Sequence, residues 1–453
     1  MERNMTSGSP LRLLLAFSLP LFLGNLFQQI YSMVDTVVVG RFVGVDALAA
    51  LGAVGGFSFM CVGFAQGLGC GFAVLVSQCY GAGDHDRMRK AYAMSIVASI
   101  VVGIVVSLLF FAFSMPMLEL VRTPSNIISM ANDYISIIYI GLLASVFYNL
   151  FSSILRAVGD SRSPLLFLLI SSVLNVVLDL FLVLVIPMGC AGVAIATILS
   201  QAISAVISYF YIAGKFPIFR FRKGDFRLDF NMIRILLKIG LPGAIQFSVC
   251  AIGVIIVQIA INGFGSDIVA AYSIGNKIET LLSQMFTALG MAISTYAGQN
   301  LGAGNLDRIR KGFRTCFALI VAWSLISYVL SFFVTEPLAY LFIDSSTADQ
   351  QVIDNAMLYV RVVILFFIPL GMIFLFRTGC QGLGSGAIPM ISSITELVAR
   401  IIAAFTLPMW FGYLGVCYAS PVAWVAAAII LPICYAVQIQ GIRKKLVHRQ
   451  GVI

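Results

Sequence analysis

Long apolar stretches separated by short polar segments run along almost the whole chain of 453 residues. Each stretch is continuously apolar and lacks the alternation of period two that marks barrel strands, so it predicts a helix. A helix needs about 20 residues to cross the roughly 30 Å hydrocarbon core of a bilayer. Twelve stretches reach this length, near residues 13–39, 46–79, 91–113, 134–155, 164–186, 192–213, 239–262, 268–300, 313–334, 357–379, 388–408 and 415–438. The pattern predicts an all-α integral membrane protein with twelve transmembrane helices.

A repeat divides these helices into two sets of six. The segment 81–90 returns 221 positions later as the segment 302–311, with the same Gly-Ala-Gly start and the same Asp-Arg pair. The most polar internal stretch, residues 215–238, separates the copies and is predicted to be a cytoplasmic linker. We therefore predict an amino-terminal lobe over residues 1–214 and a carboxy-terminal lobe over residues 239–453. Because six spans preserve orientation, the lobes are pseudo-symmetric about the membrane normal, which is typical of transporters.

The composition and the position of the charges support a membrane protein. Hydrophobic residues make up 60% of the chain and charged residues 10%, against about 25% charged residues in ordinary soluble domains. With a cytoplasmic amino terminus, the external segments hold only Arg41, Arg122 and Arg361, the spans hold Lys277 and Arg400, and all other Lys and Arg are cytoplasmic. This distribution follows the positive-inside rule and predicts that both termini are cytoplasmic. The net charge of +9 therefore reflects orientation in the lipid bilayer, and we exclude nucleic acid as a partner.

No motif for catalysis or for a cofactor is found in the sequence. It contains no nucleotide-binding P-loop, no HExxH zinc motif and no GxSxG nucleophile elbow. The nine cysteines are scattered through the apolar stretches without a CxxC pair, and the two histidines, His85 and His448, lie beside basic residues. A zinc site therefore lacks ligands. We predict that the protein is not an enzyme, needs no cofactor, and uses an ion gradient to drive transport.

Two acids in the amino-terminal half lie where hydrocarbon is expected. A charge at the centre of a membrane helix costs at least about 2.5 kcal/mol, yet Asp35 and Asp179 both fall in the outer half of their spans. Asn175 lies one turn from Asp179, and Thr197 enters the same layer from the next span. One interpretation is a hydrogen-bonded network that only packs helices. A proton or cation site is favoured, because no base accompanies the two acids in this half.

The sequence does not identify the ion at this site. Burial and mutual repulsion would favour the protonated form of at least one carboxyl group, which would make the site sensitive to a proton gradient. The oxygens of Asp35 and Asp179, together with those of Asn175 and Thr197, would equally suit Na⁺. We predict no other metal, and H⁺ and Na⁺ stay as alternatives.

Other polar residues lie within the predicted spans. Gln28 and Tyr31 precede the first acid by seven and four residues and share its helix face. Glu279 lies near the middle of the eighth span and is a candidate contact for a cationic substrate, unless a partner on another helix satisfies it. Glu396 and Arg400 have the i,i+4 spacing of an intrahelical ion pair. This pair is either structural or takes part in a central cleft.

These features together resemble the multidrug and toxic compound extrusion (MATE) family. The resemblance rests on Pro20-Leu21-Phe22 leading to Val34-Asp35-Thr36, the Gly-Ala-Gly loop at 81–83 with its copy at 302–304, and Asn175 with Asp179. It covers nearly the whole chain. Within the family the chain is similar to the DinF-like prokaryotic branch. That resemblance implies a proton- or sodium-coupled antiporter that exports cationic or amphipathic compounds across the bacterial inner (plasma) membrane, and we expect it to work as a monomer.

The resemblance also implies roles for particular residues. It gives ion coupling to Asp35 and Asp179, with Asn175 and Thr197 in the same network, and it puts Gln28 and Tyr31 in the lining of the amino-lobe cavity. The related NorM-type branch carries an acid in the seventh span, where this chain has Cys250. The resemblance therefore does not extend ion coupling to the carboxy-terminal lobe, and Glu279 is a substrate contact proposed from its position alone.

The two copies of the repeat differ at the acids. Asp35 falls opposite Ile256 or Val257, and Asp179 falls opposite Ala404. These departures from the repeat indicate that ion coupling belongs to the amino-terminal lobe. The expected mechanism is alternating access between two lobe arrangements.

The main alternative function is a lipid-linked carrier flippase of the same superfamily. Such a protein would need several cationic side chains in its cleft to bind a pyrophosphate. The predicted spans contain only Lys277 and Arg400, so the sequence favours a drug antiporter.

Overall fold

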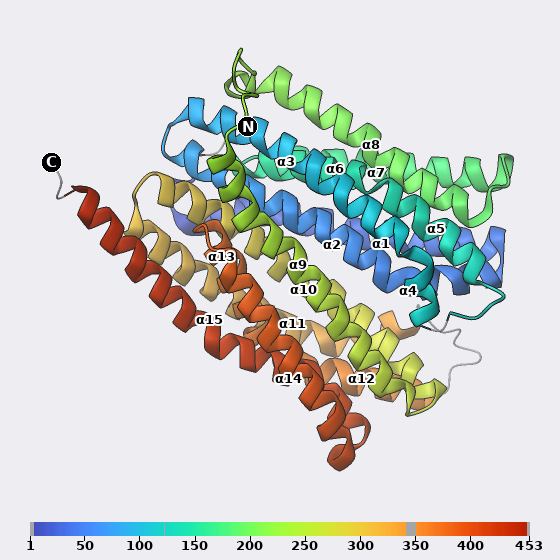
Figure 1. Ribbon diagram of the computed structural model, residues 1–453. Helices are drawn as coiled ribbons and strands as arrows, with labels where there is room; N and C mark the ends of the chain where they lie inside the picture. Colours follow the sequence, from blue (N-terminus) through green and yellow to red (C-terminus); the bar gives the residue numbers. More distant parts are fainter. Residues whose placement is uncertain (1–3, 122, 341–349, 451–453) are drawn as a thin grey trace. The chain divides into compact units, whose positions relative to one another are not determined.

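A computed structural model of the protein describes residues 4–121, 123–340 and 350–450. Regular secondary structure in these residues is entirely helical (Figure 1). The α-helices are α1 (Pro10–Val38), α2 (Val45–Gly81), α3 (His85–Ala112), α4 (Ser114–Leu120), α5 (Ile128–Ile140), α6 (Leu142–Ala157), α7 (Arg162–Leu180), α8 (Gly189–Lys215), α9 (Phe230–Asn262), α10 (Ser266–Gly302), α11 (Leu306–Tyr340), α12 (Gln350–Ile364), α13 (Phe367–Gly382), α14 (Ala387–Phe411) and α15 (Tyr413–Gln450). Two π-helical turns, η1 (Val39–Val43) and η2 (Phe181–Val185), and one 3₁₀ turn, η3 (Pro217–Phe219), complete the set.

The described residues contain nine helices that are long and apolar enough to cross a bilayer. Two bent pairs add one span each, α5 with α6 at 48° and α12 with α13 at 53°. Helix α10, which is 37 residues long and carries Asp267, Lys277 and Glu279, is not among these eleven. The predicted all-α membrane fold is confirmed. Arg122, one of the predicted external basic residues, lies outside the described part of the chain.

The sequence repeat is also a repeat of structure. Helices α2 and α10 are both 37 residues long, and α6 and α13 both have 16. Each 37-residue helix begins after a glycine with positive φ, Gly44 at 121° and Gly265 at 92°. The turns that follow these helices contain Gly83 at 71° and Gly304 at 73°. Glycine adopts these angles without the strain that a Cβ would cause, so the local chemistry of both copies produces the same turns.

The chain forms two compact units. Unit 1 consists mainly of Leu23–Ser248, and unit 2 consists of the described residues of Met5–Phe22 and Val249–Ile453. Helices α1 and α9 therefore contribute to both units, and each divides a few residues after its internal proline, Pro20 or Pro242.

In unit 1, glycines let α2 and the first part of α9 approach at backbone distance. A Cβ built on Gly67 would lie 2.4 Å from the carbonyl oxygen of Gly243, and one on Gly71 would lie 2.3 Å from the Cα of Gly240. Membrane helices gain stability mainly from van der Waals packing, because lipid is as apolar as their side chains. Close approach of these two backbones therefore holds this part of α9 in unit 1.

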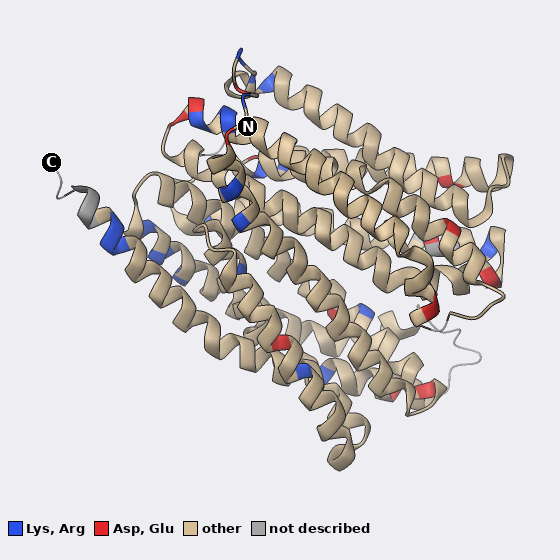
Figure 2. Cartoon of the chain, in the orientation of Figure 1, with Lys and Arg blue, Asp and Glu red and all other residues tan. Residues whose placement is uncertain are grey.

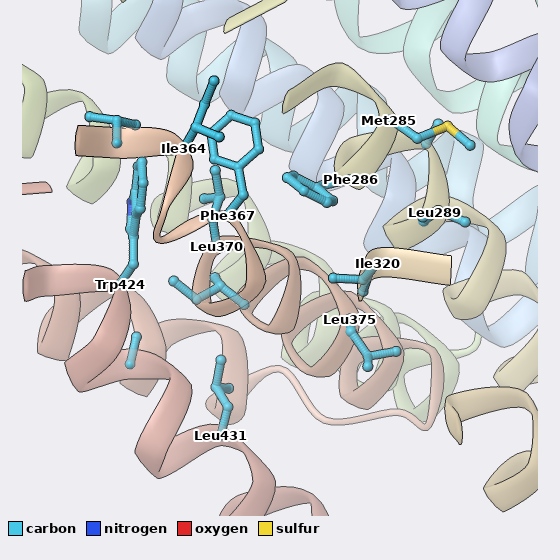
Figure 3. Close-up of a cluster of buried hydrophobic side chains, with 14 of the residues drawn as sticks. Met285, Phe286, Leu289, Ile320, Ile364, Phe367, Leu370, Leu375, Trp424 and Leu431 are labelled. Atoms are coloured by element: carbon cyan, nitrogen blue, oxygen red, sulfur yellow. The ribbon is translucent and has the colours of Figure 1, made fainter. Parts of the chain in front are cut away.

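In unit 2, the largest buried cluster is built from large apolar side chains of several helices. Figure 3 shows part of it, with Met285, Phe286 and Leu289 from α10, Ile320 from α11, Ile364 from α12, Phe367, Leu370 and Leu375 from α13, and Trp424 and Leu431 from α15. The rings of Phe286 and Phe367 meet edge to face with centroids 5.4 Å apart, a preferred geometry for aromatic pairs. The first part of α1 joins this unit through Phe22, whose ring lies 5.4 Å from that of Trp323 on α11.

Charged residues lie mostly toward helix ends, and Figure 2 shows long uncharged stretches along the helices. In unit 1, the segment before α9 is tied to the start of α3, with Lys90 2.8 Å from Asp229 and Arg89 3.6 Å from Asp225. The hydrogen bond from Lys90 holds the pKa of Asp229 below its ordinary value, and the backbone N–H of Met232 adds to this effect.

In unit 2, the chain before α1 is tied to the turn between α10 and α11. The backbone N–H of Met5 donates to the side chain of Gln299 at 2.8 Å, and Met5 itself is fully buried. The amide of Asn300 and the guanidinium of Arg308 both donate to the carbonyl oxygen of Met5 at 3.1 Å. Arg308 also donates to the carbonyl oxygen of Gly8 at 3.1 Å. Each turn of the repeat is thus held by the polar segment that precedes the first helix of the other copy.

Candidate functional site

Two acids of unit 1 lie on α1 and α7 just before each helix changes its winding. Asp35 precedes η1 by one turn, and Asp179 precedes η2 by two residues. The two π-helical turns contact each other. Their packing includes Val39 and Val183, which share a small buried cluster. Such turns are rare and occur frequently at functional sites, because they redirect side chains within a helix.

The carboxyl groups of Asp35 and Asp179 lie close enough to interact electrostatically. Asp179 is fully buried, and Asn175, one turn earlier on α7, is 2% exposed. One oxygen of Asp35, both oxygens of Asp179 and both polar atoms of the Asn175 amide are buried, and none has a hydrogen-bond partner in the described structure. Two ionised carboxylates only accept hydrogen bonds, so a direct bond between them requires a proton on one oxygen.

Among the residues that the structure describes, no basic side chain forms an ion pair with either acid. The ion pairs of unit 1, as far as the chain is described, lie within α3 or between α3 and the segment before α9, and neither acid takes part in one. Buried polar groups are normally satisfied, and two adjacent buried carboxylates without a counter-ion are costly. The arrangement is therefore suited to hold one or two protons, or a hard cation that prefers oxygen ligands. A cluster of three or more His, Cys, Asp or Glu that could hold a metal is not found among the described residues.

Tyrosines surround the acid pair. Tyr31 interacts electrostatically with both acids and is hydrogen-bonded to Gln28 on the preceding turn of α1. Tyr134 on α5 also interacts with both acids and with Tyr31. The sequence analysis missed Tyr134, although its place at the outer end of the fourth predicted span was a usable signal.

Thr197 is part of α8, and its hydroxyl donates to the carbonyl oxygen of Val193 on the same helix at 3.0 Å. No hydrogen bond from Thr197 to either acid occurs within the described part of the chain. The structure thus brings Asp35, Asp179 and Asn175 together, whereas Thr197 is occupied by its own helix backbone.

In unit 2, Glu279 on α10 has a partner from another helix. The hydroxyl of Tyr359 on α12 donates to its Oε2 at 2.6 Å, and the Tyr359 side chain is buried. The ring of Tyr272 packs edge to face on Tyr359 with centroids 5.0 Å apart. Glu279 is thus held by an aromatic hydroxyl separated from it by 80 residues in the sequence.

The carboxylate of Glu396 on α14 binds two arginines. Nη2 of Arg400 lies 2.7 Å from its Oε1, and Nη2 of Arg377 on α13 lies 2.5 Å from its Oε2. Arg377 also donates to the hydroxyl of Ser392 at 3.0 Å. All three charged residues are at most 8% exposed. The thiol of Cys250 on α9 lies 3.9 Å from Ser393 on the same stretch of α14, so the seventh span reaches this polar cluster without an acid.

Sequence reasoning missed Arg377. It was counted with the cytoplasmic basic residues because it lies two residues before the predicted end of its span at 379. In the structure, α13 continues to Gly382, and Arg377 is buried within it. Closeness to the predicted end of a span therefore did not show that this arginine is buried.

The chain was compared with known proteins. Residues 20–181 and 242–406 match the sequence pattern of the family described as MatE. The chain is 26% identical over 414 residues to the probable multidrug resistance protein YoeA of Bacillus subtilis, covering 88% of this chain and 89% of that protein. It is 26% identical over 409 residues to the probable multidrug resistance protein NorM of Thermotoga maritima, covering 89% of this chain and 87% of the relative.

Solved structures support the same fold. One of them is described as the outward-facing conformation of a multidrug resistance MATE family transporter. It superposes with a TM-score of 0.89 at 21% identity, covering 97% of this chain and 98% of the other. Structures of this fold have twelve helices in two lobes, which confirms the predicted fold class.

Proposed function

Because the chain belongs to the MatE family, we propose that it is a secondary active multidrug efflux antiporter. In this proposal it exports cationic or amphipathic compounds in exchange for H⁺ or Na⁺ by alternating access. The relatives are named as multidrug resistance proteins, which supports small-molecule drugs as substrates and argues for transport rather than catalysis. The proposed location is the bacterial plasma membrane, with both termini in the cytoplasm and the monomer as the working unit.

The observation that carries the proposal is the uncompensated acid pair of unit 1. Asp35 and Asp179 are adjacent, and in the described part of the chain neither has a basic partner and their oxygens are largely without hydrogen-bond donors. In a medium of low dielectric constant this state is stabilised by a bound proton or cation. An external ion that neutralises the pair lowers the free energy of the lobe arrangement that exposes the pair. Such a difference between the two arrangements is required for coupling an ion gradient to a conformational change.

Competition between drug and ion gives antiport in its simplest form. A cationic substrate that approaches Tyr31 and Gln28 would be attracted by the ionised pair, and it would lose that attraction once H⁺ or Na⁺ neutralises Asp35 and Asp179. Ion and drug then weaken each other's binding, and thermodynamic linkage makes this effect reciprocal. Asn175 adds an amide oxygen beside the pair, and we propose that it binds the ion with the two acids. Thr197 would join this site if its hydroxyl oxygen bound the ion while the hydroxyl still donated its proton to the carbonyl oxygen of Val193.

Glu279 stays in the proposal as a substrate contact of the carboxy-terminal lobe. Its bond to Tyr359 means that a cationic substrate would have to share the carboxylate with that hydroxyl. The Glu396–Arg400 pair is given a structural role. The proposed lobes are residues 1–214 and 239–453, joined by the linker 215–238.

The proposal is tested by ethidium export from proteoliposomes driven by an imposed proton gradient or an imposed sodium gradient. We expect Asp35→Asn and Asp179→Asn each to lower gradient-driven export at least about tenfold, because neutral amides remove the charge that the ion must compensate. Asp133→Asn is the matched control, since Asp133 is an exposed acid of the same unit. Unchanged export by both buried variants would refute ion coupling at this pair. Activity under only one of the two gradients identifies the ion.

A flippase for a lipid-linked carrier is the second candidate. Arg377 adds one buried cation to the two recognised in the sequence, which is the observation in its favour. Both Arg377 and Arg400 are bound to Glu396, so neither offers a free charge for a pyrophosphate. Transfer of a fluorescent lipid pyrophosphate across the proteoliposome bilayer, without ethidium export, would reverse the ranking of the two functions.

A further inference from the structure

Unit 2 contains a counterpart of the acid-pair layer, and its chemistry is different. The register that places Ala404 opposite Asp179 also places Arg400 opposite Asn175, because α7 and α14 begin at equivalent positions. The register of Pro20 and Pro242 places Gly253 opposite Tyr31. The layer that holds two acids, an amide and a phenol in unit 1 therefore holds an arginine and a glycine in unit 2.

The guanidinium of Arg400 occupies the space beside Gly253. A Cβ built on Gly253 would lie 2.9 Å from Nη1 of Arg400 and 3.4 Å from its Cδ. Any larger side chain on this face of α9 would displace the guanidinium. Since Gly253 lies inside a regular helix, where glycine is unfavourable, close approach of the arginine accounts for it. The position of the Tyr31 ring in unit 1 is thus taken by a cationic group in unit 2.

Two acids converge on this guanidinium. Its Nη2 binds Glu396 at 2.7 Å, and Glu279 interacts with it electrostatically while accepting the bond from Tyr359. Arg377 neutralises Glu396 from the opposite side at 2.5 Å. Nε of Arg400 is buried without a hydrogen-bond partner, so its hydrogen bonding is incomplete. The residue is therefore held there mainly by the attraction between its charge and the two carboxylates.

We propose that Arg400 is a built-in cation that permanently fills, in unit 2, the site that an exchangeable cation fills in unit 1. With Arg377 and Arg400 against Glu279 and Glu396, this cluster is balanced without any external ion. Ion exchange is then confined to one site per chain, in unit 1. This last consequence rests on the proposed function, whereas the occupied site itself does not.

The test removes the built-in cation and offers a free one. Arg400→Ala leaves a vacancy beside Gly253 that is the size of a guanidinium group, and it removes the cation that faces Glu279 and Glu396. The probe is guanidinium chloride at millimolar concentration, and the readout is the melting temperature of the full chain in detergent. We expect a saturable rise of about 1–3 °C for Arg400→Ala and none for the unsubstituted protein. Urea, which has the same shape and no charge, should give no rise.

A second variant isolates the role of charge. Arg400→Ala combined with Glu279→Gln leaves the neutral Arg377–Glu396 pair, so guanidinium should no longer raise its melting temperature. Equal effects of guanidinium and urea on Arg400→Ala would overturn the proposal, as would an equal rise in the unsubstituted protein. Because no step of this experiment uses Asp35 or Asp179, it fails independently of the proposed ion coupling in unit 1.

Gly253→Ala keeps the test valid if Arg400→Ala does not fold. Its added Cβ collides with the guanidinium, so it should lower the melting temperature of the unsubstituted protein by a few degrees. In an Arg400→Lys background, the slimmer ammonium should make the same substitution nearly neutral. An equal loss in both backgrounds would show that the guanidinium does not fill this place.

Discussion

Asp179 and Asp35 lie side by side although they are more than 140 positions apart in the sequence, and neither forms an ion pair in the described part of unit 1. Their adjacency converts two separately costly acids into one site with a shared requirement for positive charge. The same relationship gives the first prediction.

Asp179→Asn should stabilise the protein when no coupling ion is bound. The substitution removes the repulsion between the buried Asp179 and the half-buried Asp35. It leaves an amide that can donate a hydrogen bond to Asp35, so a gain of about 1–3 kcal/mol is expected. The measurement is thermal unfolding in detergent at pH 8 without sodium. Asp133→Asn serves as the exposed control, and a lower melting temperature for Asp179→Asn would contradict the interpretation of an uncompensated pair.

Glu396→Gln should strongly destabilise unit 2. It leaves Arg377 and Arg400 buried next to each other without a direct counter-ion, and breaking buried pairs in this way costs about 3–5 kcal/mol. Expression yield and unfolding temperature measure the loss. Glu336→Gln, on an exposed position of α11, makes the same chemical change at the surface. Similar behaviour of the two variants would mean that the triad contributes no net stability.

Gly71→Ala should weaken the contact between α2 and the first part of α9. Its methyl group would lie 2.3 Å from the Cα of Gly240, and because backbone cannot move aside as a side chain does, a cost of about 1–3 kcal/mol follows. Gly52→Ala on the same helix meets nothing within 4 Å and should be neutral or slightly stabilising. The measurement is the unfolding temperature of Gly71→Ala and of Gly52→Ala. Equal temperatures would contradict a close backbone contact at Gly71.

Arg308→Ala should release the segment before α1 from unit 2. It removes the bonds to the carbonyl oxygens of Met5 and Gly8, each worth about 1–3 kcal/mol for a charged donor. Limited proteolysis should then cleave the chain ahead of α1 at least several-fold faster. Arg310→Ala removes only an exposed i,i+3 contact with Asp307 and should leave the cleavage rate unchanged. Equal rates in both variants would contradict the anchoring role of Arg308.

Asp229 should make the attachment of the linker to α3 depend on pH. Because its pKa in the folded protein is lowered by Lys90, its stabilising effect is complete above the ordinary carboxyl pKa of about 4 and is lost as the pH falls through the lower folded value. In the unsubstituted protein, proteolysis of the linker should become faster as the pH is lowered from 5. Asp229→Asn should be cleaved faster at neutral pH and should show a smaller acceleration.

Much of the fold could be predicted from the sequence, because it depends on local properties. Continuous apolar runs specify membrane helices, and the Gly-Ala-Gly turns at 81–83 and 302–304 specify where two of them end. The acids Asp35 and Asp179 were recognised because a charge in an apolar run is costly wherever it occurs. Their common depth followed from residue counting along the helix.

The partners of these residues could not be predicted in the same way. Tyr359 binds Glu279 across 80 residues, and Arg377 binds Glu396 from a different helix, α13. Such contacts depend on the rotation of each helix about its axis, on the bends between α5 and α6 and between α12 and α13, and on the π-helical turns after the acids. No local sequence pattern encodes these quantities.

The sequence by itself determined the class of protein, the twelve helices, the internal repeat and the acids that have no place in hydrocarbon. Only the tertiary structure decided that α1 and α9 each contribute to both compact units, that Asp35 meets Asp179 without a base, and that Arg400 lies between two acids beside Gly253. The physical reason is that a helix forms from the hydrogen bonds of its own backbone, whereas charge compensation in a membrane depends on which side chains neighbouring helices bring within a few ångströms.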